Sequence, residues 1–159
     1  MDLILLPDVS LSEVMGFLEL LEDAGGREDV FRISESLNLE LDDILPVIEA
    51  GELLALLEAE EGDVALTALG RGFLDADVNQ RKKILARQLA GIKVFARVLA
   101  TLREHRNGRA PRRLFIDEFA ERLPDEEAAR LVHTVVDWGR YAEIIGYSPE
   151  TEEVYLDQG

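Results

Sequence analysis

The chain has 159 residues, 47% of them hydrophobic, with no cysteine and a formal net charge of -16. This length allows one domain or two small ones with a hydrophobic core, and the lack of cysteine excludes disulfides and thiolate metal sites. The opening apolar run, Leu3 to Leu6, has no preceding basic residues and is too short for a signal peptide or a membrane span. We therefore expect a cytoplasmic protein with no membrane insertion.

Charge is distributed unevenly along the chain. Residues 1–79 contain 20 Asp and Glu against 3 Arg, a net charge of -17, whereas residues 80–159 contain 13 acids against 14 Lys and Arg, a net charge of +1. A sharp change at one point indicates two units with different surroundings. We therefore predict an acidic first domain over 1–78 and a second domain over 79–159.

The first half has the pattern of three helices followed by a hairpin. Apolar residues at helical spacing predict a helix from Leu11 to Gly25-Gly26, a second over 29–37, and a third that starts near Asp42 and closes at Gly51. The stretches on either side of Glu61-Gly62 predict a hairpin. This is the order of elements in a winged helix. A further helix over 69–76 follows as a connector.

The second half begins with a long helical pattern over 79–106. Its apolar residues cover more than one stripe, so this helix should contact two neighbours. Asn107-Gly108 ends it, and a short helix follows over 112–123. Three acidic residues follow Pro124 and predict the start of another helix, because the positive N-terminal end of a helix favours negative side chains. Gly139 marks the expected end of this helix. Residues 144–147 and 154–156 predict a second hairpin.

A weak internal repeat relates the two halves. From Gly51 and again from Gly139, an offset of 88 residues, a helix-ending Gly is followed by an apolar pair, one spacer and an aliphatic pair. In each half an acidic helix precedes this pattern and a hairpin follows it. We therefore predict a mainly α fold with small β-hairpins (α+β), in which tandem winged-helix-like domains are joined by the long helix.

The charges argue against DNA binding, although the third helix of a winged helix commonly enters the major groove. In the first half this helix, over 40–52, carries five acids and no Lys or Arg, so its surface would repel phosphate. The corresponding helix of the second half is mixed in charge. DNA binding therefore stays an alternative only for the second half.

One basic cluster lies in the second half, and we define it as Arg103, His105, Arg106, Arg109, Arg112 and Arg113. It is either a helix end whose cations favour the helix dipole, followed by a solvated loop, or a docking patch for an acidic surface. That surface would belong to the first half or to a partner protein. The aromatic residues near the last helix are either core or a ligand-stacking surface. The candidate interaction residues are Arg109, Arg112, Arg113, Trp138, Arg140 and Tyr141.

We predict no catalytic, cofactor or metal site. The sequence has no Gly-x-x-x-x-Gly-Lys-Ser/Thr, so the chain should not hydrolyse nucleotide alone, and it has no Gly-x-Ser-x-Gly. His105 and His133 are 28 residues apart, without metal-ligand spacing. The carboxylates are abundant, and no pair stands out as acid and base. We therefore expect a protein that is not an enzyme.

Short motifs spread over about residues 7–156 carry a family resemblance. They are Pro7-Asp8-Val9-Ser10, Gly25-Gly26-Arg27-Glu28-Asp29, Asp42-Asp43-Ile44-Leu45-Pro46, Glu61-Gly62-Asp63 with Leu66-Thr67, Gly70-Arg71, Ala76-Asp77 and, above all, Asp137-Trp138-Gly139-Arg140-Tyr141-Ala142-Glu143. In these the chain resembles the C-terminal AAA-associated domain family, found downstream of the ATP-binding cassette in nitrate, sulfonate and bicarbonate type ABC transporter ATPases. The resemblance implies an accessory, non-catalytic module. No catalytic residues carry over, because the nucleotide site would lie in the cassette, which this sequence lacks.

The leading hypothesis is a regulatory module that binds an ABC transporter ATP-binding subunit or domain, or itself. It would use the acidic first half and the aromatic junction. By analogy with the fold, the long helix is the candidate surface for a homodimer. One alternative is a winged-helix transcription regulator that uses the second half and its arginines. The other is a small-ligand sensor with a pocket between the two domains.

Overall fold

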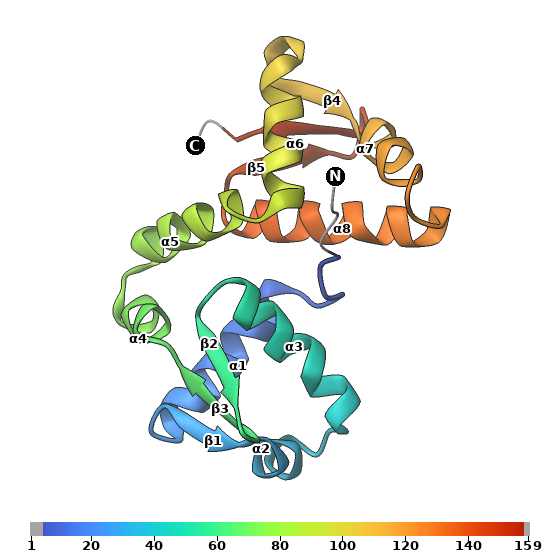
Figure 1. The fold of residues 1–159 in the computed structure, drawn as a ribbon. Helices are drawn as coiled ribbons and strands as arrows, with labels where there is room; N and C mark the ends of the chain where they lie inside the picture. Colours follow the sequence, from blue (N-terminus) through green and yellow to red (C-terminus); the bar gives the residue numbers. More distant parts are fainter. Residues whose placement is uncertain (1–4, 158–159) are drawn as a thin grey trace. The chain divides into compact units, whose positions relative to one another are not determined.

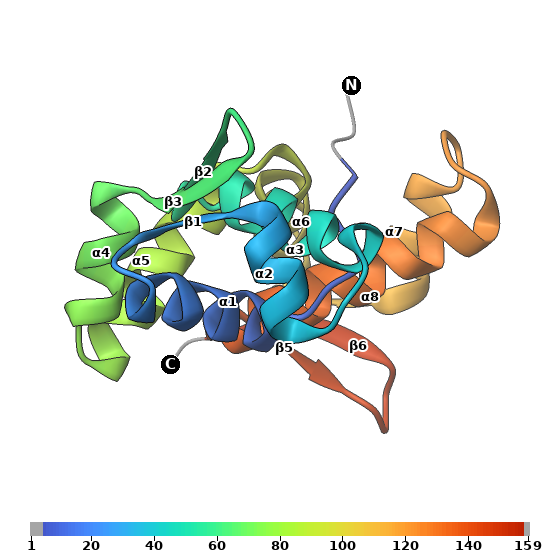
Figure 2. The same ribbon diagram turned by 90° about the horizontal axis from the view of Figure 1, so that it is seen from below.

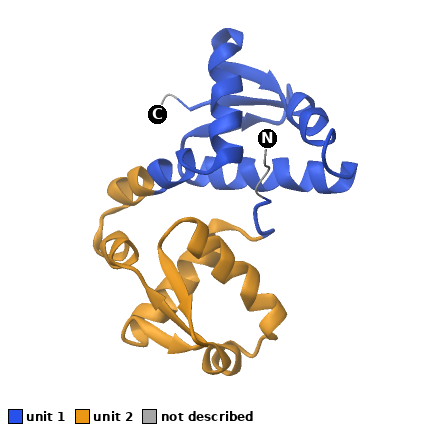
Figure 3. Cartoon of the chain, in the orientation of Figure 1, with its two compact units in different colours: residues 1–8, 85–159 blue, residues 9–84 orange. Residues whose placement is uncertain are grey.

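The computed structural model describes residues 5–157, which form two compact units (Figure 3). The N-terminal unit, orange in Figure 3, is residues 9–84, and the C-terminal unit, blue, is residues 85–157 together with 5–8. The division between Ile84 and Leu85 lies a few residues beyond Asn79. The segment before Val9 is grouped with the C-terminal unit rather than with the residues that follow it.

The N-terminal unit consists of helices packed on one small sheet (Figure 1). The strands pair antiparallel in the order β1-β3-β2 and lie side by side in Figure 2. Six side chains of α1 are buried and form much of the core. The elements are α1 (Leu11–Asp23), β1 (Arg27–Asp29), α2 (Val30–Leu37), α3 (Leu41–Leu53), β2 (Leu57–Glu60), β3 (Asp63–Leu66), α4 (Ala68–Asp75) and α5 (Val78–Ala90), the last crossing the division between the units.

Side-chain caps fix where three of these helices begin. The Ser10 hydroxyl accepts a hydrogen bond from the Glu13 amide at 3.1 Å, and Thr67 accepts one from Gly70 at 2.9 Å. The Asp29 carboxylate accepts from the amides of Phe31 and Arg32 at 2.9 and 3.2 Å. Each cap satisfies amide groups that the first turn of a helix leaves without a partner.

The C-terminal unit repeats the same order of helix, strand, helix, helix and hairpin. Its strands again form a three-stranded antiparallel sheet with the last strand in the centre, in the order β4-β6-β5. The core side chains come mainly from α6 and α8. The elements are α6 (Lys93–Glu104), η1 (Arg106–Gly108), β4 (Arg109–Pro111), α7 (Arg112–Phe119), α8 (Asp125–Tyr141), β5 (Ile145–Ser148) and β6 (Glu153–Leu156).

The mainly α fold class with small hairpins is confirmed, but the long helix is not one helix. It is interrupted after Ala90: Gly91 and Ile92 leave the helix, and Ile92 has an extended backbone with φ -86 and ψ 127. Glycine has poor helix propensity and the β-branched isoleucine does little to offset it, so the chain turns and α6 starts afresh at Lys93. The division between the two units falls within α5, and the break lies in the C-terminal unit.

The repeat predicted from Gly51 and Gly139 is present in the structure, but these glycines do not end their helices. Both lie inside the helix, where an added Cβ would collide with the side chains of Leu57 and Ile145 respectively. The left-handed residues that follow each helix are Ala55, at φ 60, and Glu143, at φ 59. Glycine is required here for close helix-to-strand packing, and the offset of 88 residues is kept.

The strands β1 and β4 were missed by the sequence analysis. Each is three residues long and pairs with the last strand of its unit, Arg27 opposite Ala65 and Arg109 opposite Tyr155. Three residues give no alternation of apolar and polar side chains to detect. They complete the two sheets.

Candidate functional site

Arg109 in the basic cluster is held by side chains of its own sheet. Its Nε donates to the Glu153 carboxylate at 3.2 Å, and its guanidinium lies 4.9 Å from the centre of the Tyr155 ring. A guanidinium over an aromatic face is attracted by the ring's electrons. Arg109 therefore links the edge strand β4 to the central strand β6. This role is structural.

The N-terminal unit contains an equivalent of this ion pair. Arg27 is the first residue of β1, Asp63 is the first of β3, and their side chains are 2.8 Å apart. The hydrogen bond to Asp63, with the attraction of its charge, raises the pKa of the Arg27 guanidinium above its usual value. An Arg-to-acid pair at the same place in both sheets indicates that Arg109 belongs to the repeated fold more than to a docking patch.

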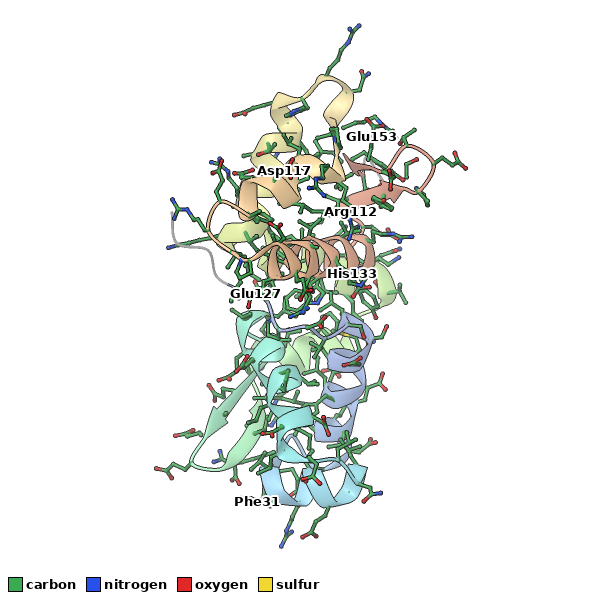
Figure 4. The ribbon with its side chains drawn as sticks, turned by 90° about the vertical axis from the view of Figure 1, so that its right-hand side faces the viewer. Phe31, Arg112, Asp117, Glu127, His133 and Glu153 are labelled. Carbon is green, nitrogen blue, oxygen red and sulfur yellow. The ribbon has the colours of Figure 1, made fainter. Side chains whose placement is uncertain are left out.

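Arg112 and Arg113 lie in the first turn of α7. The Arg112 guanidinium is 5.3 Å from the centre of the Tyr147 ring, and its amide donates to the Glu152 carbonyl at 2.9 Å (Figure 4 labels Arg112). Arg113 is 77% exposed and pairs with Asp117 one helical turn later. Arg113 is thus the most available of these three candidate cations, while Arg112 is half-buried.

The side chain of Trp138 is not accessible to a partner protein. It is fully buried, and its ring stacks on that of Phe95 with centroids 6.3 Å apart and planes inclined by 14°. We accordingly remove it from the candidate interaction residues: its place on the inward face of α8 makes it core. Arg140 and Tyr141, from the last turn of the same helix, are exposed. Neither belongs to the strand and helix that carry Arg109 and Arg112.

The outward faces of α3 and α8 differ in character. On α3 the exposed charged side chains are all acidic: Asp42, Asp43, Glu49 and Glu52. On α8 the chain's own N-terminal segment lies beside part of the face. Leu5, Leu6 and Asp8 line a groove of about 170 Å³ with residues of α8 that include Glu127, Arg130 and Leu131. That part of α8 is therefore not free to enter a DNA groove.

Among residues 5–157, a small cavity in the C-terminal unit measures about 10 Å³ and is lined by apolar side chains alone. It is at the lower limit for one water molecule and offers that water no polar partner. Within the same residues no group of three His, Cys, Asp or Glu side chains could hold a metal ion. None of their helices has the length and apolarity of a membrane span.

An open groove in the N-terminal unit was missed by the sequence analysis. It runs between α1 and α2, past β1, and has a volume of about 510 Å³. The residues that line it are Gly16, Glu19, Leu20, Asp23, Ala24, Glu28, Arg32, Ile33 and Ser36. The signal that could have revealed it is Gly16, a glycine in the middle of a helix that otherwise has a strong apolar face.

Comparison with known families gives one match, over residues 31–148, to the C-terminal AAA-associated domain. The chain belongs to this family. Membership makes it an accessory domain linked to AAA or ABC ATPases. No curated protein and no solved structure matches the chain.

Within this AAA-associated domain, the motif that carried the resemblance proves to be largely structural. In the stretch from Asp137 to Glu143, Trp138, Gly139 and Ala142 are buried, and Glu143 is the left-handed residue that ends α8. The family match begins at Phe31 and so leaves out α1. Of the residues that line the groove between α1 and α2, Arg32, Ile33 and Ser36 lie inside the matched range, and those of α1 and β1 lie outside it.

Proposed function

We propose that this chain is a non-catalytic regulatory module that binds the ATP-binding subunit or domain of an ABC transporter in the cytoplasm. The observation that carries the proposal is the family match over residues 31–148, since it links the chain to ATPases. The transporter type, for nitrate, sulfonate or bicarbonate, rests on the resemblance of the motif over 137–143.

The order of elements and the charges support a protein partner over DNA. In each unit the order helix, strand, helix, helix, hairpin supports its assignment as a winged helix. The helix that would read DNA in the N-terminal unit presents only carboxylates, which repel phosphate. In the C-terminal unit, Leu5, Leu6 and Asp8 lie beside part of the corresponding helix. These two observations weigh against a transcription regulator.

The lack of nucleotide motifs supports a module without its own activity. The sequence has no phosphate-binding loop with its lysine, and so the hydrolysis of ATP would belong to the partner. An accessory domain can act on such a partner only through differential binding to its nucleotide states. We therefore expect affinity for the ATPase to change with nucleotide.

The test is binding of the full chain to the purified ATP-binding subunit encoded nearest to it. Titrations are made without nucleotide, with ATP and with ADP, beside a titration with a mixed-sequence DNA duplex. The proposal predicts micromolar or tighter binding that differs between nucleotide states, and no binding to DNA. Absence of ATPase binding in every state, with a salt-dependent DNA complex instead, would favour the transcription regulator.

A further inference from the structure

The turn between α6 and β4 contains an Asn-Gly pair, Asn107-Gly108, in an exposed position. The pair belongs to the three-residue helix η1, none of whose residues is buried. Asn107 is exposed and has a left-handed backbone, with φ 63 and ψ 14. A left-handed position favours asparagine or glycine, which accounts for the residue type. It also leaves the side-chain amide of Asn107 in contact with water.

The side chain of an asparagine can be attacked by the backbone nitrogen of the next residue. Here the Gly108 nitrogen would bond to Cγ of Asn107 and close a five-membered ring, a reaction that the proximity of the two atoms favours. Glycine has no Cβ to obstruct the approach and adopts backbone conformations that other residues rarely adopt. The nitrogen must first lose its proton, and positive charge nearby stabilises the anion that forms. Arg106 and Arg109 flank the pair in the chain.

We propose that Asn107 is a site of spontaneous deamidation. The bond from the Gly108 nitrogen to Cγ forms, the bond from Cγ to Nδ2 breaks, and ammonia leaves with the proton that the backbone nitrogen lost. Water then opens the resulting succinimide ring. Opening between Cγ and the nitrogen gives aspartate, whereas opening between the backbone carbonyl carbon and the nitrogen gives isoaspartate, in which the main chain runs through the side chain. The reaction consumes water alone and is independent of the function proposed above.

The folded turn slows this reaction without preventing it. The Gly108 amide donates a hydrogen bond to the His105 carbonyl at 3.0 Å, and this bond holds the proton that must be lost. The turn must therefore open before the nitrogen can attack. Short exposed segments with few buried contacts open locally at little cost in free energy. The rate of deamidation in the folded protein then depends on how often η1 opens.

Both products alter the chain just before β4. Aspartate adds a negative charge between Arg106 and Arg109. Isoaspartate lengthens the main chain by one carbon atom, next to a strand of three residues whose register places Arg109 opposite Tyr155. The Arg109 side chain also donates to the Glu153 carboxylate at 3.2 Å. We expect isoaspartate, but not aspartate, to weaken the pairing of β4 with β6.

Asn38 is a control within the same molecule. It is also exposed and left-handed, at φ 54, and the amide of the next residue, Leu39, donates a hydrogen bond to the Ser34 carbonyl at 3.1 Å. Its neighbours differ from those of Asn107, because leucine follows it and the acidic Glu40 comes next. Leucine obstructs the attacking nitrogen, and negative charge opposes the loss of its proton. Both differences should slow the reaction at Asn38.

The test is incubation of the purified full-length chain at physiological temperature, at neutral and at mildly alkaline pH. Digestion at glutamates then leaves residues 105–118 and 36–40 in separate peptides, so that mass spectrometry assigns a gain of one mass unit to either asparagine. We expect Asn107 to deamidate about tenfold or more faster than Asn38. The rate should rise with pH, because the attacking nitrogen must lose a proton.

Two changes test the reasons for this difference. Leu39→Gly gives Asn38 the neighbour that Asn107 has and should accelerate its deamidation about tenfold. Urea breaks the hydrogen bond between Gly108 and His105 and should raise the rate at Asn107. An unchanged rate after the substitution would contradict the role of glycine, and an unchanged rate in urea would contradict protection by the turn.

A last measurement concerns the products. Anion exchange separates them from the parent chain, since each carries one more negative charge, and fragmentation in the mass spectrometer distinguishes isoaspartate from aspartate. We expect the isoaspartate fraction to unfold at a lower urea concentration than the parent, and Asn107→Asp to unfold close to it. An isoaspartate fraction as stable as the parent would refute the effect on β4. Deamidation at Asn107 that is no faster than at Asn38 would overturn the site itself.

Discussion

Gly70 is the position where one added methyl group should do most damage. A Cβ there would overlap the carbonyl oxygen of Leu56 and lie 3.0 Å from the carbonyl carbon, well inside ordinary contact. The Leu56 carbonyl is part of the backbone, so it cannot avoid the added Cβ by a change of rotamer as a side chain could. Gly70→Ala therefore forces α4 to move on the order of 1 Å from the turn between α3 and β2, and such overpacking costs about 1–3 kcal/mol.

The upper limit comes from the two side chains that α4 buries. Phe73 is 1% exposed and Leu74 is 9% exposed, and burial of each stabilises the fold by about 1.5–3 kcal/mol. Complete loss of α4 packing would then cost about 3–6 kcal/mol, and the better helix propensity of alanine returns about 1 kcal/mol. We expect Gly70→Ala to lower the free energy of unfolding by about 2 kcal/mol, the value at which the overpacking cost and the packing limit meet once the gain from alanine is subtracted from each.

The assay is urea denaturation followed by far-ultraviolet circular dichroism, with Gly72→Ala as the control. Gly72 lies in the same helix and has nothing within 4 Å of its added Cβ, so alanine should stabilise the protein there by about 0.5–1 kcal/mol. Equal stability of the two variants would refute the close approach of α4 to Leu56 and, with it, the packing described for this helix.

Three further substitutions test other parts of the fold by the same denaturation assay. Glu143→Gly should stabilise the protein by about 0.5–1 kcal/mol, because glycine adopts the left-handed conformation at φ 59 without strain; destabilisation would contradict that conformation. Trp138→Ala should cost about 3–5 kcal/mol, and a cost below 1 kcal/mol would place the ring at the surface. Glu153→Gln should cost less than about 1 kcal/mol, since its side chain and that of Arg109 are 29% and 38% exposed; an effect unchanged by salt would argue against an ion pair.

The sequence predicted the repeated architecture because it depends on periodicity. The apolar stripes of α1 and α8 and the turn signal at Glu61-Gly62 are local features, and the structure confirms the elements they indicate. The role of Gly51 and Gly139 could not be read locally. A glycine near the end of a helix favours termination, but here its use is to admit Leu57 or Ile145, residues whose approach only the folded sheet determines.

The same limit applies to the candidate interaction residues. Trp138 follows the exposed Asp137 in sequence, and only its position on the helix face next to Phe95 shows that it is core. Arg109 reads as one more cation of a cluster, whereas the structure pairs it with Glu153, 44 residues away. The groove at Gly16 combines two helices and a strand. No single stretch of sequence could predict it.

The most direct measurement of the central claim is the ATP hydrolysis rate of the partner subunit as the full-length chain is added. Hydrolysis is followed at saturating ATP over a range of chain concentrations, with heat-denatured chain as the control. The account predicts a saturable rise or fall in the rate, with a midpoint that matches the binding affinity. A rate that stays constant while binding approaches saturation would contradict a regulatory role and leave a module that only attaches to the ATPase.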